Sequence, residues 1–370
     1  MPDDLHIDWL RLIRSPGIGA ATVGRLIQHL GHPTAILQAK RSQLAAIPSI
    51  HGPVLQAIEG FRRAVPAPPM IQELQRLHDL GGQMLMPGTP DYPASLTTLH
   101  DPPPALFAIG DCTLLHREWR ITITGTRQAT PRGLTFAAQL AREMSAIGMV
   151  TISGLSAGID AAAHMSALEH QGATIAVLAT GIDIVHPRPH RKLQQQIATH
   201  GCLISEAPLG LLPVPWAFPA RARILAALAQ GVVIVEAPEK SGSLLTAHMA
   251  LDQGREVFAV PGAPNDPNTR GTHALLRQGA CLLEGISDLL QALQWSPPSL
   301  PVMPSAAQTH DLPDQTAAIL TLIHNGTSRE DELARLSRMT VTTLARILLQ
   351  LELSGLIQRL PGGSYTVRQI

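Results

Sequence analysis

The sequence predicts an α/β protein whose central domain is a doubly wound, mostly parallel sheet of the Rossmann type. The first observation is that Ile121–Arg127 and Ser153–Asp160 each join a short apolar run to a small-residue turn and a helical pattern. The second is that further apolar runs, rich in Val and Ile, alternate with helical patterns between residues 120 and 290. Strands that are apolar on both faces are typical of a parallel sheet covered by helices.

Each expected strand of this sheet is short and is followed by a turn. The expected strands are Ile121–Thr124, Val150–Ser153, Thr174–Leu178, Leu203–Ser205, Val232–Glu236 and Glu256–Ala259. Helical patterns lie between them, for example at Gly133–Ile147 and Asp160–Gln171. Ahead of the sheet we expect a helix around Ile71–Leu80 and then, through residues 92–107, an extended proline-rich strap packed on the sheet.

Composition divides the chain into four parts. Residues 1–68 read as short helices, in which Pro16–Gly19 has the pattern of a helix-hairpin-helix turn or, equally, of a turn that packs a small helical domain. Residues 69–292 hold the α/β pattern. Residues 293–313 are rich in proline and read as a linker, and residues 314–370 form a C-terminal domain.

The C-terminal domain has the pattern of a winged helix. Its expected elements are helices at Gln315–His324, Arg329–Ser337 and Val341–Leu353 and hairpin strands at Leu356–Leu360 and Ser364–Val367 around Pro361–Gly363. The third helix has Arg346 as its one basic residue, whereas a helix that enters the major groove normally carries several basic or amide side chains. We therefore expect this domain to pack or to contact protein rather than to read a DNA sequence.

Overall charge does not indicate a polyanionic partner, because Lys+Arg 28 balances Asp+Glu 28. A nucleic-acid binder of this composition must gather its positive charge locally. The 3 cysteines are far apart and form no CxxC motif, so we expect neither a disulfide framework nor a metal site. We expect a cytoplasmic location, because the sequence shows no signal-peptide pattern and no apolar run long enough for a membrane span.

The turn formed by Gly125, Thr126 and Arg127 is the first candidate phosphate site. Thr126 and the N–H groups after it can donate to a phosphate, and Arg127 can clamp it with a planar fork; a plain surface arginine is the alternative. Ser241 and Gly242 open a further helix in the same way. Five such turns lie at the expected rim, yet G-x-G-x-x-G and an acid to hold a ribose are absent. A nucleotide cofactor therefore loses support, and we expect no cofactor.

Gly154 and Gly158 free the loop ahead of the helix that carries Asp160 and His164. The last two residues are four apart and share a helix face, so they could be an acid/base pair. We favour a structural interpretation, in which Asp160 braces the turn and His164 locks the loop by a hydrogen bond. No obvious nucleophile or second carboxylate lies beside them in the sequence.

Arg221 and Arg223 lie two residues apart, close to Phe218. If the segment is extended, both guanidinium groups point to one face, and an aromatic ring beside clustered arginines is typical of a platform for single-stranded DNA. If it is helical, the two arginines diverge, one forms a structural salt bridge, and Phe218 belongs to the core. The other candidates for a basic groove are Arg127, Arg191 and Lys192.

These motifs in combination resemble the DNA-processing protein A family (DprA, also called Smf). The resemblance covers about residues 85–290 and is carried by Gly125–Arg127, Ser153–Asp160 with His164, Ser205–Pro208, Phe218–Ile224, Val235–Glu236, Ser241–Ser243 with Thr246, Gly254–Gly262 and Gly279–Ala280. The flanks also fit, because a small sterile-alpha-like helical domain and a C-terminal winged helix occur in that family.

The resemblance implies an extended Rossmann domain without catalytic activity. Such a domain would bind single-stranded DNA, form a homodimer, and load the recombinase RecA onto DNA during natural transformation. Carried over by motif position, Arg127, Phe218, Arg221 and Arg223 would line the DNA pocket, with the turn at Gly154–Gly158 beside it. Lys192, Ser241 and Gly242 complete the set of candidate DNA contacts.

Two departures from the family pattern put the DNA affinity in doubt more than the fold. The family usually has Asn where this chain has Ala222, and Tyr-Pro followed by Asn where this chain has His186–Pro187 and His190. The alternative function is that of a LOG-like nucleoside-monophosphate phosphoribohydrolase or another nucleotide-binding protein, which shares the fold. Its Pro-Gly-Gly-x-Gly-Thr motif is missing, since Pro-Gly-Gly occurs only at Pro361–Gly363. A scaffold with unused turns is the third hypothesis.

Overall fold

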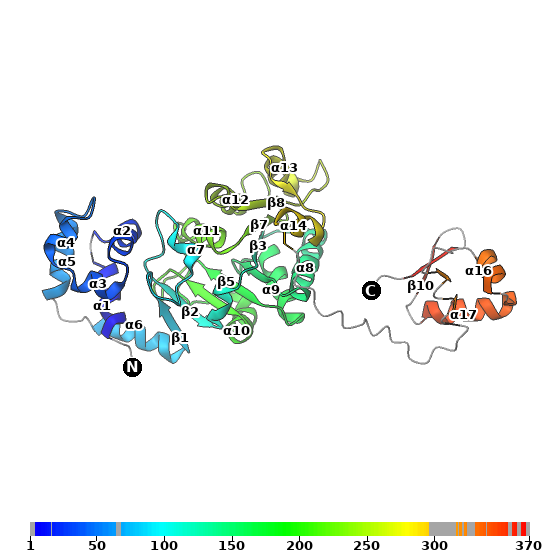
Figure 1. Cartoon of the computed structure of the whole chain (residues 1–370), viewed down its shortest axis with the longest axis horizontal. Coiled ribbons are helices and arrows are strands. Elements are labelled where there is room, and N and C mark those ends of the chain that lie inside the picture. Colours follow the sequence, from blue (N-terminus) through cyan, green and yellow to red (C-terminus); the bar gives the residue numbers. More distant parts are fainter. Residues whose placement is uncertain are drawn as a thin grey trace. The chain divides into compact units, whose positions relative to one another are not determined.

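The computed structural model of the chain describes residues 4–15, 17–63, 68–295, 316, 318–319, 322–323, 330–337, 339–353, 357–360 and 364–367. They fall into two compact units, Met1–Ser296 and Pro297–Ile370, which are treated separately below (Figure 1). Among the described residues, no helix combines the length and apolar character needed to cross a membrane.

One sheet organises the first unit. Its described strands follow the order β1-β2-β6-β5-β4-β3-β7-β8-β9, and all neighbours from β6 to β9 are parallel. Only the pairs β1–β2 and β2–β6 are antiparallel. The strands are β1 Gly82–Leu85, β2 Leu106–Gly110, β3 Arg120–Thr124, β4 Val150–Ser153, β5 Thr174–Leu178, β6 Cys202–Ser205, β7 Gly231–Ile234, β8 Glu256–Ala259 and β9 Cys281–Leu282. The predicted doubly wound, mostly parallel sheet is confirmed.

The six expected strands are β3 to β8, with ends that differ by at most two residues. The expectation of a strap through residues 92–107 is wrong at its end, because Leu106 and Phe107 belong to β2, where Leu106 pairs with β1 and Phe107 pairs with β6. The three prolines just before β2 hid this strand in the sequence. β1 and β9 were not predicted either.

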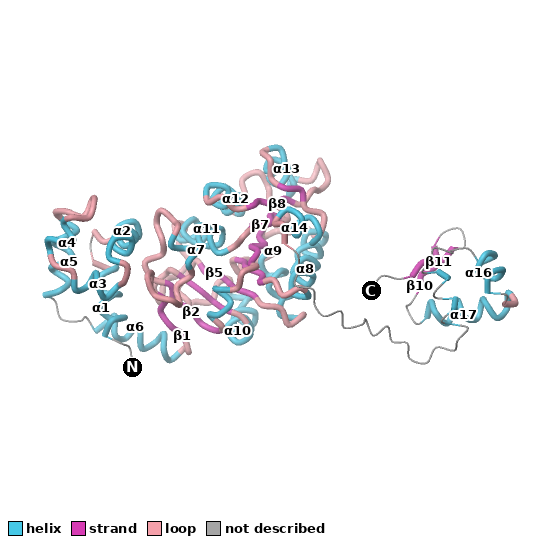
Figure 2. Tube along the Cα trace, in the orientation of Figure 1, coloured by secondary structure: helices cyan, strands magenta, loops and turns pink. Residues whose placement is uncertain are grey.

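Helices cover both faces of the sheet (Figure 2). Ile175 and Val177 of β5 belong to one core cluster, whereas Ala176 and Leu178 of the same strand belong to another. The helices of this region are α7 Ala94–Thr97, η1 Cys112–His116, α8 Pro131–Ala146, α9 Ile159–Glu169, η2 Arg188–His190, α10 Arg191–His200, α11 Ala217–Leu228, α12 Ser243–Asp252, η3 Pro267–Thr269, α13 Arg270–Arg277 and α14 Ile286–Ala292. Alternate side chains of a strand thus fill two separate cores.

The N-terminal region is helical, as expected, and packs against the sheet domain within the same unit. Its helices are α1 Asp4–Ile13, α2 Ala20–Leu30, α3 Pro33–Gln38, α4 Arg41–Ala45, α5 Pro53–Arg63 and α6 Pro68–Asp79. Trp9 is fully buried and donates to the Pro104 carbonyl oxygen at 2.8 Å. Glu73 pairs with Arg14 and accepts from the Leu209 N–H at 2.9 Å. The domain boundary at residue 68 stays a prediction.

The second unit contains α16 Glu330–Ser337, α17 Val341–Leu353 and an antiparallel pair, β10 Ile357–Leu360 and β11 Ser364–Val367. Leu344 and Leu348 of α17 pack with Ile357 and Tyr365 of the two strands, which joins the wing to the third expected helix. The linker at 293–313 and the turn at Pro361–Gly363 lie mainly or wholly outside the described residues, as does much of the helix expected at Gln315–His324.

Candidate functional site

A cavity of about 610 Å³ lies at the carboxyl ends of β3, β4 and β7. The turns after these strands line it together with the first two turns of α11. A smaller cavity of about 130 Å³ adjoins it and adds His186 and Pro187 to the wall. Arg127, Phe218 and Arg221 line both cavities, so these three side chains form the boundary between them. This is the edge at which open α/β sheets bind their ligands.

Phe218 has two guanidinium groups close to its ring. The Arg127 Cζ is 5.4 Å from the centre of the Phe218 ring, and the Arg221 Cζ is 5.5 Å from it. The His186 ring meets the same phenyl group edge-on, with 6.3 Å between ring centres and 68° between planes. Phe218 is half-buried and lines the cavity, so it is not the core residue that the helical alternative implied. Both cations are within cation–π range of one ring.

Arg221 is held in place by the turn after β4. Its Nη1 donates to the carbonyl oxygen of Gly154 at 2.8 Å, while its buried Nε has no hydrogen-bond partner. Burial lowers the pKa of Arg221, the Arg127 charge lowers it further, and Asp160 opposes both. Within the part of the chain that the structure describes, this Nε–H has no acceptor, and the atom is buried rather than open to the cavity.

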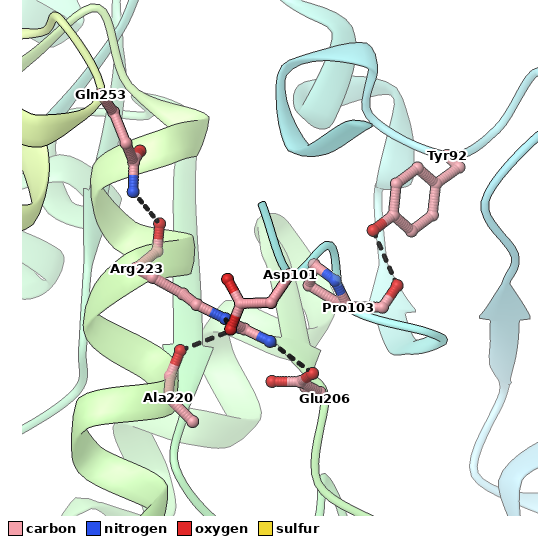
Figure 3. A network of polar contacts seen from close by, with 7 residues as sticks. All are labelled: Tyr92, Asp101, Pro103, Glu206, Ala220, Arg223 and Gln253. Atoms are coloured by element: carbon pink, nitrogen blue, oxygen red, sulfur yellow. Dashed lines mark hydrogen bonds and ion pairs between the residues drawn. The ribbon is translucent and has the colours of Figure 1, made fainter. Parts of the chain in front are cut away.

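Arg223 does not belong to this cavity. The segment is the helix α11, so Arg221 and Arg223 diverge, as the helical alternative predicted. Figure 3 shows Arg223 donating to Asp101 at 3.0 Å, to Glu206 at 2.6 Å and to the Ala220 carbonyl oxygen at 3.0 Å. Burial opposes its charge, but Glu206 and Asp101 raise the pKa of Arg223. With 8% of its surface exposed, Arg223 is a structural ion-pair residue, which corrects its expected place in the DNA pocket.

The turn at Gly125, Thr126 and Arg127 differs from expectation at its centre. The Thr126 N–H donates to the Glu236 carbonyl oxygen at 2.7 Å, and Thr126 is 8% exposed. This one N–H is therefore not available to a phosphate, although Thr126 is among the residues that line the larger cavity. Arg127 is exposed and reaches both cavities.

Glu236 is a residue that the sequence reasoning missed. Its carboxylate accepts from the Thr130 N–H at 2.9 Å and from the Thr130 hydroxyl, at the N-terminus of α8. A Cβ on Gly133 would lie 2.4 Å from the Glu236 carboxyl carbon. A protein carboxylate thus occupies the helix N-terminus where a nucleotide phosphate would sit in a dinucleotide-binding domain. The pair Val235–Glu236 was visible in the sequence, but its partner lies 106 positions away.

The turn after β4 is braced by Asp160. The Asp160 carboxylate accepts from the Thr124 hydroxyl at 2.8 Å and from the Ser156 N–H at 3.2 Å. Gly158 has a φ of 78°, and a Cβ there would lie 2.4 Å from the Thr126 carbonyl oxygen. The two turns therefore approach each other at a distance that only glycine permits.

His164 is fully buried, and its hydrogen bond goes to a strand rather than to the loop. Its Nδ1 lies 2.7 Å from the Thr174 hydroxyl, which itself donates to the Thr151 carbonyl oxygen. Thr174 therefore accepts from Nδ1–H, and the imidazole is neutral. Burial is the main cause that lowers the pKa of His164 to about 3, and repulsion from the His190 charge adds to it. The expected lock on the loop is corrected: His164 joins α9 to β4 and β5.

The remaining candidates divide into two groups. Ser241 and Gly242 line the larger cavity beside Lys240, and the Ser241 hydroxyl lies 2.8 Å from that of Ser243. Lys192 is exposed on the first turn of α10 and is not among the residues that line either cavity. The lining of the larger cavity includes three cations, Arg127, Arg221 and Lys240, and one carboxylate, that of Asp160.

The cavity has the chemistry of an anion site with an aromatic wall. Both Asp160 oxygens accept hydrogen bonds from neutral groups of the protein, and the three cations of the lining outnumber its single negative charge. Burial lowers the pKa of His186, and the nearby positive charges of Arg127 and Arg221 lower it further. Within the described ranges, no group of three or more His, Cys, Asp or Glu side chains is arranged to hold a metal ion.

Three family models match the chain. The model of DNA recombination-mediator protein A matches residues 83–294, the DprA winged helix domain matches residues 303–363, and the DprA-like N-terminal HHH domain matches residues 3–49. Protein Smf of Synechocystis sp. is 31% identical over 97% of this chain and 98% of its own length.

Two solved structures share the fold. DNA processing protein A of Streptococcus pneumoniae has a TM-score of 0.68 and 28% identity, over 78% of this chain and 99% of the other. DNA processing protein A of Helicobacter pylori has a TM-score of 0.53 and 32% identity, over 58% of this chain and 95% of the other. The H. pylori structure was solved to describe a single-stranded DNA binding mode.

Proposed function

The chain belongs to the DNA recombination-mediator protein A (DprA) family, and on this premise we propose that it binds single-stranded DNA in the cavities around Phe218. The observation that carries the proposal is that the half-buried Phe218 ring has the Arg127 and Arg221 guanidinium groups within 5.4 and 5.5 Å of its centre. An aromatic face on which a base can stack, beside cations that neutralise the backbone, is the arrangement found in sequence-tolerant single-strand sites.

Each cation has a distinct part in this proposal. Arg127 is exposed and can follow a phosphate, whereas Arg221 is fixed by its hydrogen bond to Gly154 and supplies a charge at a set position. Lys240 and the Ser241 hydroxyl extend the polar wall on the far side of the larger cavity. The carboxylate of Glu236 at the α8 N-terminus disfavours a nucleotide cofactor there, because two anions would share one helix end.

We further propose that the protein acts without catalysis. Asp160, the carboxylate that lines the larger cavity, accepts hydrogen bonds on both oxygens, one from Thr124 and one from Ser156. The nearby His164 is buried and neutral. Neither group is placed to transfer a proton to a ligand. The LOG-like alternative needs such a group; release of free base from a nucleoside monophosphate by the purified protein would establish that alternative instead.

Three finer statements rest on family membership. We propose that the protein loads RecA onto the bound strand, forms a homodimer through its α/β domain, and works in the cytoplasm. The partnership is tested by RecA filament assembly on strands coated with single-strand-binding protein. The dimer is tested by the mass of the protein in solution across a concentration series.

The site itself is tested by fluorescence anisotropy with a labelled single-stranded oligonucleotide and its duplex at several salt concentrations. Binding should favour the single strand and should weaken as salt rises, because phosphate neutralisation releases counterions. The variants are Arg127→Ala, Arg221→Ala and the control Arg142→Ala, an exposed arginine near the other end of α8. Unchanged affinity after both cavity arginines are removed would show that the strand binds elsewhere.

A further inference from the structure

Two of the three cysteines meet at the edge between β2 and β6, although 90 positions separate them in the sequence. Cys202 begins β6 and pairs with Gly110 of the antiparallel strand β2. The Asp111 N–H then donates to the Gly201 carbonyl oxygen at 2.8 Å, which continues the pairing by one residue. Cys112 follows directly, at the start of η1. This pairing fixes the backbones on either side of both thiols.

The two thiols have unequal surroundings. Cys202 is fully buried, whereas Cys112 is partly exposed and packs against the core cluster that contains Cys202. The Cys202 thiol is within hydrogen-bonding reach of the Cys112 sulfur. That contact, against the effect of burial, lowers the pKa of Cys112 to about 7, and it raises the pKa of Cys202 well above the ordinary value. At neutral pH a large share of Cys112 is therefore thiolate, the form that reacts.

We propose that Cys112 and Cys202 form a peroxide-sensitive dithiol that closes to a reversible disulfide. The Cys112 thiolate attacks one oxygen of hydrogen peroxide, the O–O bond breaks, and hydroxide leaves, which gives the sulfenic acid of Cys112. The Cys202 sulfur then attacks the Cys112 sulfur. The S–S bond forms, the S–O bond breaks, and the departing hydroxide takes the Cys202 proton as water. Two thiols are oxidised and one peroxide is reduced to two waters.

Burial assigns the order of these steps. Cys202, with 0% of its surface exposed, cannot meet a dissolved oxidant, so the first attack belongs to Cys112. Cys202 is then the resolving thiol, supplied from inside the protein. Cys281, the third cysteine, lies on β9 at the opposite edge of the sheet and does not take part.

The dithiol is independent of the proposed DNA site. Cys202 begins β6, whereas the cavities lie at the carboxyl ends of the parallel strands. The disulfide should therefore cross-link β2 to β6 without changing the affinity for single-stranded DNA. Oxidation that abolished DNA binding in the wild type and not in Cys112→Ser would contradict this separation while leaving the disulfide itself in place.

The test is to treat the full chain with a small excess of hydrogen peroxide at neutral pH, denature it, and count free thiols by alkylation and intact mass. The count should fall from three to one in a monomeric chain, and dithiothreitol should restore it. Cys202→Ser should stop at a sulfenic acid that dimedone traps, and the control Cys281→Ser should still close the bond. Three free thiols after treatment, or a cross-link between chains through Cys112, would overturn the proposal. Loss of DNA binding by Arg127→Ala would bear only on the proposed function.

Discussion

Arg221 donates a hydrogen bond of 2.8 Å to the carbonyl oxygen of Gly154, which ties helix α11 to the turn after β4. A Cβ at position 154 would lie 2.7 Å from the Arg221 Cζ. Gly154 does not have a positive φ, so its need for glycine comes from this close approach and not from its backbone conformation. The glycine therefore determines where the guanidinium rests against Phe218.

Gly154→Ala should leave the fold intact and weaken binding of single-stranded DNA. The added methyl meets the far end of a flexible side chain, so Arg221 can move aside, but it then leaves the Phe218 ring. Loss of one cation–π and charge contact predicts roughly a fivefold weaker affinity, about 1 kcal/mol. Anisotropy gives the affinity and thermal unfolding gives the stability.

Gly158→Ala is the matched comparison, because it should destabilise the protein. Its φ of 78° strains any other residue, and its Cβ would meet the backbone oxygen of Thr126 at 2.4 Å. Neither group can move without displacing a turn. If Gly154→Ala lowered the Tm as much as Gly158→Ala does, the distinction between a side-chain and a backbone contact would be wrong.

Arg127→Ala should weaken single-strand binding about equally for all sequences and should flatten its salt dependence. If Arg127 contacts one phosphate, the slope of log K against log salt should become shallower by about 0.7. The control, Arg142→Ala, removes an equal charge outside the cavity and should change neither slope nor affinity by a comparable amount. A parallel shift of both variants would assign the effect to overall charge.

The local sequence pattern was sufficient to predict most strands of the sheet. The strands β3 to β8 carry their signal within a few residues, because each is an apolar run that ends in a turn. β2 was missed because Pro102, Pro103 and Pro104 directly precede it and suggest an extended strap. β9 is only two residues long and has almost no pattern to detect.

The site was predictable only in part, for a physical reason. Arg127 and Arg221 follow motifs that can be read locally, and the topology brings them to one cavity. Arg223 pairs with Glu206, 17 positions away, and with Asp101, 122 positions away, and the Thr126 N–H is bound by Glu236, more than a hundred positions away. The spacing of residues in one sequence carries no information on such pairs. Arg223, whose charge is neutralised, therefore had the same sequence pattern around it as Arg221, which lines the cavity.

Arg223→Ala should lower stability rather than remove a DNA contact. The substitution leaves the mostly buried Glu206 without its partner, and Glu206 already has a raised pKa through burial. Asp101 is about half exposed, so its charge is hydrated and loses less stabilisation than Glu206 does when Arg223 is removed. We therefore expect a cost of about 2–3 kcal/mol in the free energy of unfolding, measured by urea denaturation. Single-strand affinity of the folded fraction should stay close to that of the wild type, in contrast to Arg221→Ala.

His164 should make the protein less stable in mild acid. Its pKa of about 3 in the folded state lies below the ordinary value of 6.5, so between these pH values the unfolded chain binds more protons. The contribution of neutral His164 is fully present above pH 6.5 and is lost as the pH falls toward 3. The slope approaches about 1.4 kcal/mol per pH unit. His164→Gln should flatten the curve of unfolding free energy against pH, and an unchanged slope in that variant would contradict the prediction.

His186→Tyr should strengthen DNA binding and remove part of its pH dependence. In the free protein, burial and the charges of Arg127 and Arg221 lower the pKa of His186, so the ring is neutral at pH 7. A bound phosphate would offset those two positive charges and make protonation easier. Binding should then take up a proton, and the affinity of the wild type should rise as the pH falls below about 6.5.

Tyrosine cannot take up that proton, and its larger ring offers more area for stacking against a base and Phe218. Anisotropy titrations at pH 8, 7 and 6 should therefore show a rising affinity for the wild type and a flatter profile for His186→Tyr. The control His200→Gln, an exposed histidine at the end of α10, should retain the wild-type profile. An equally steep profile in His186→Tyr would contradict the assignment of the proton to His186.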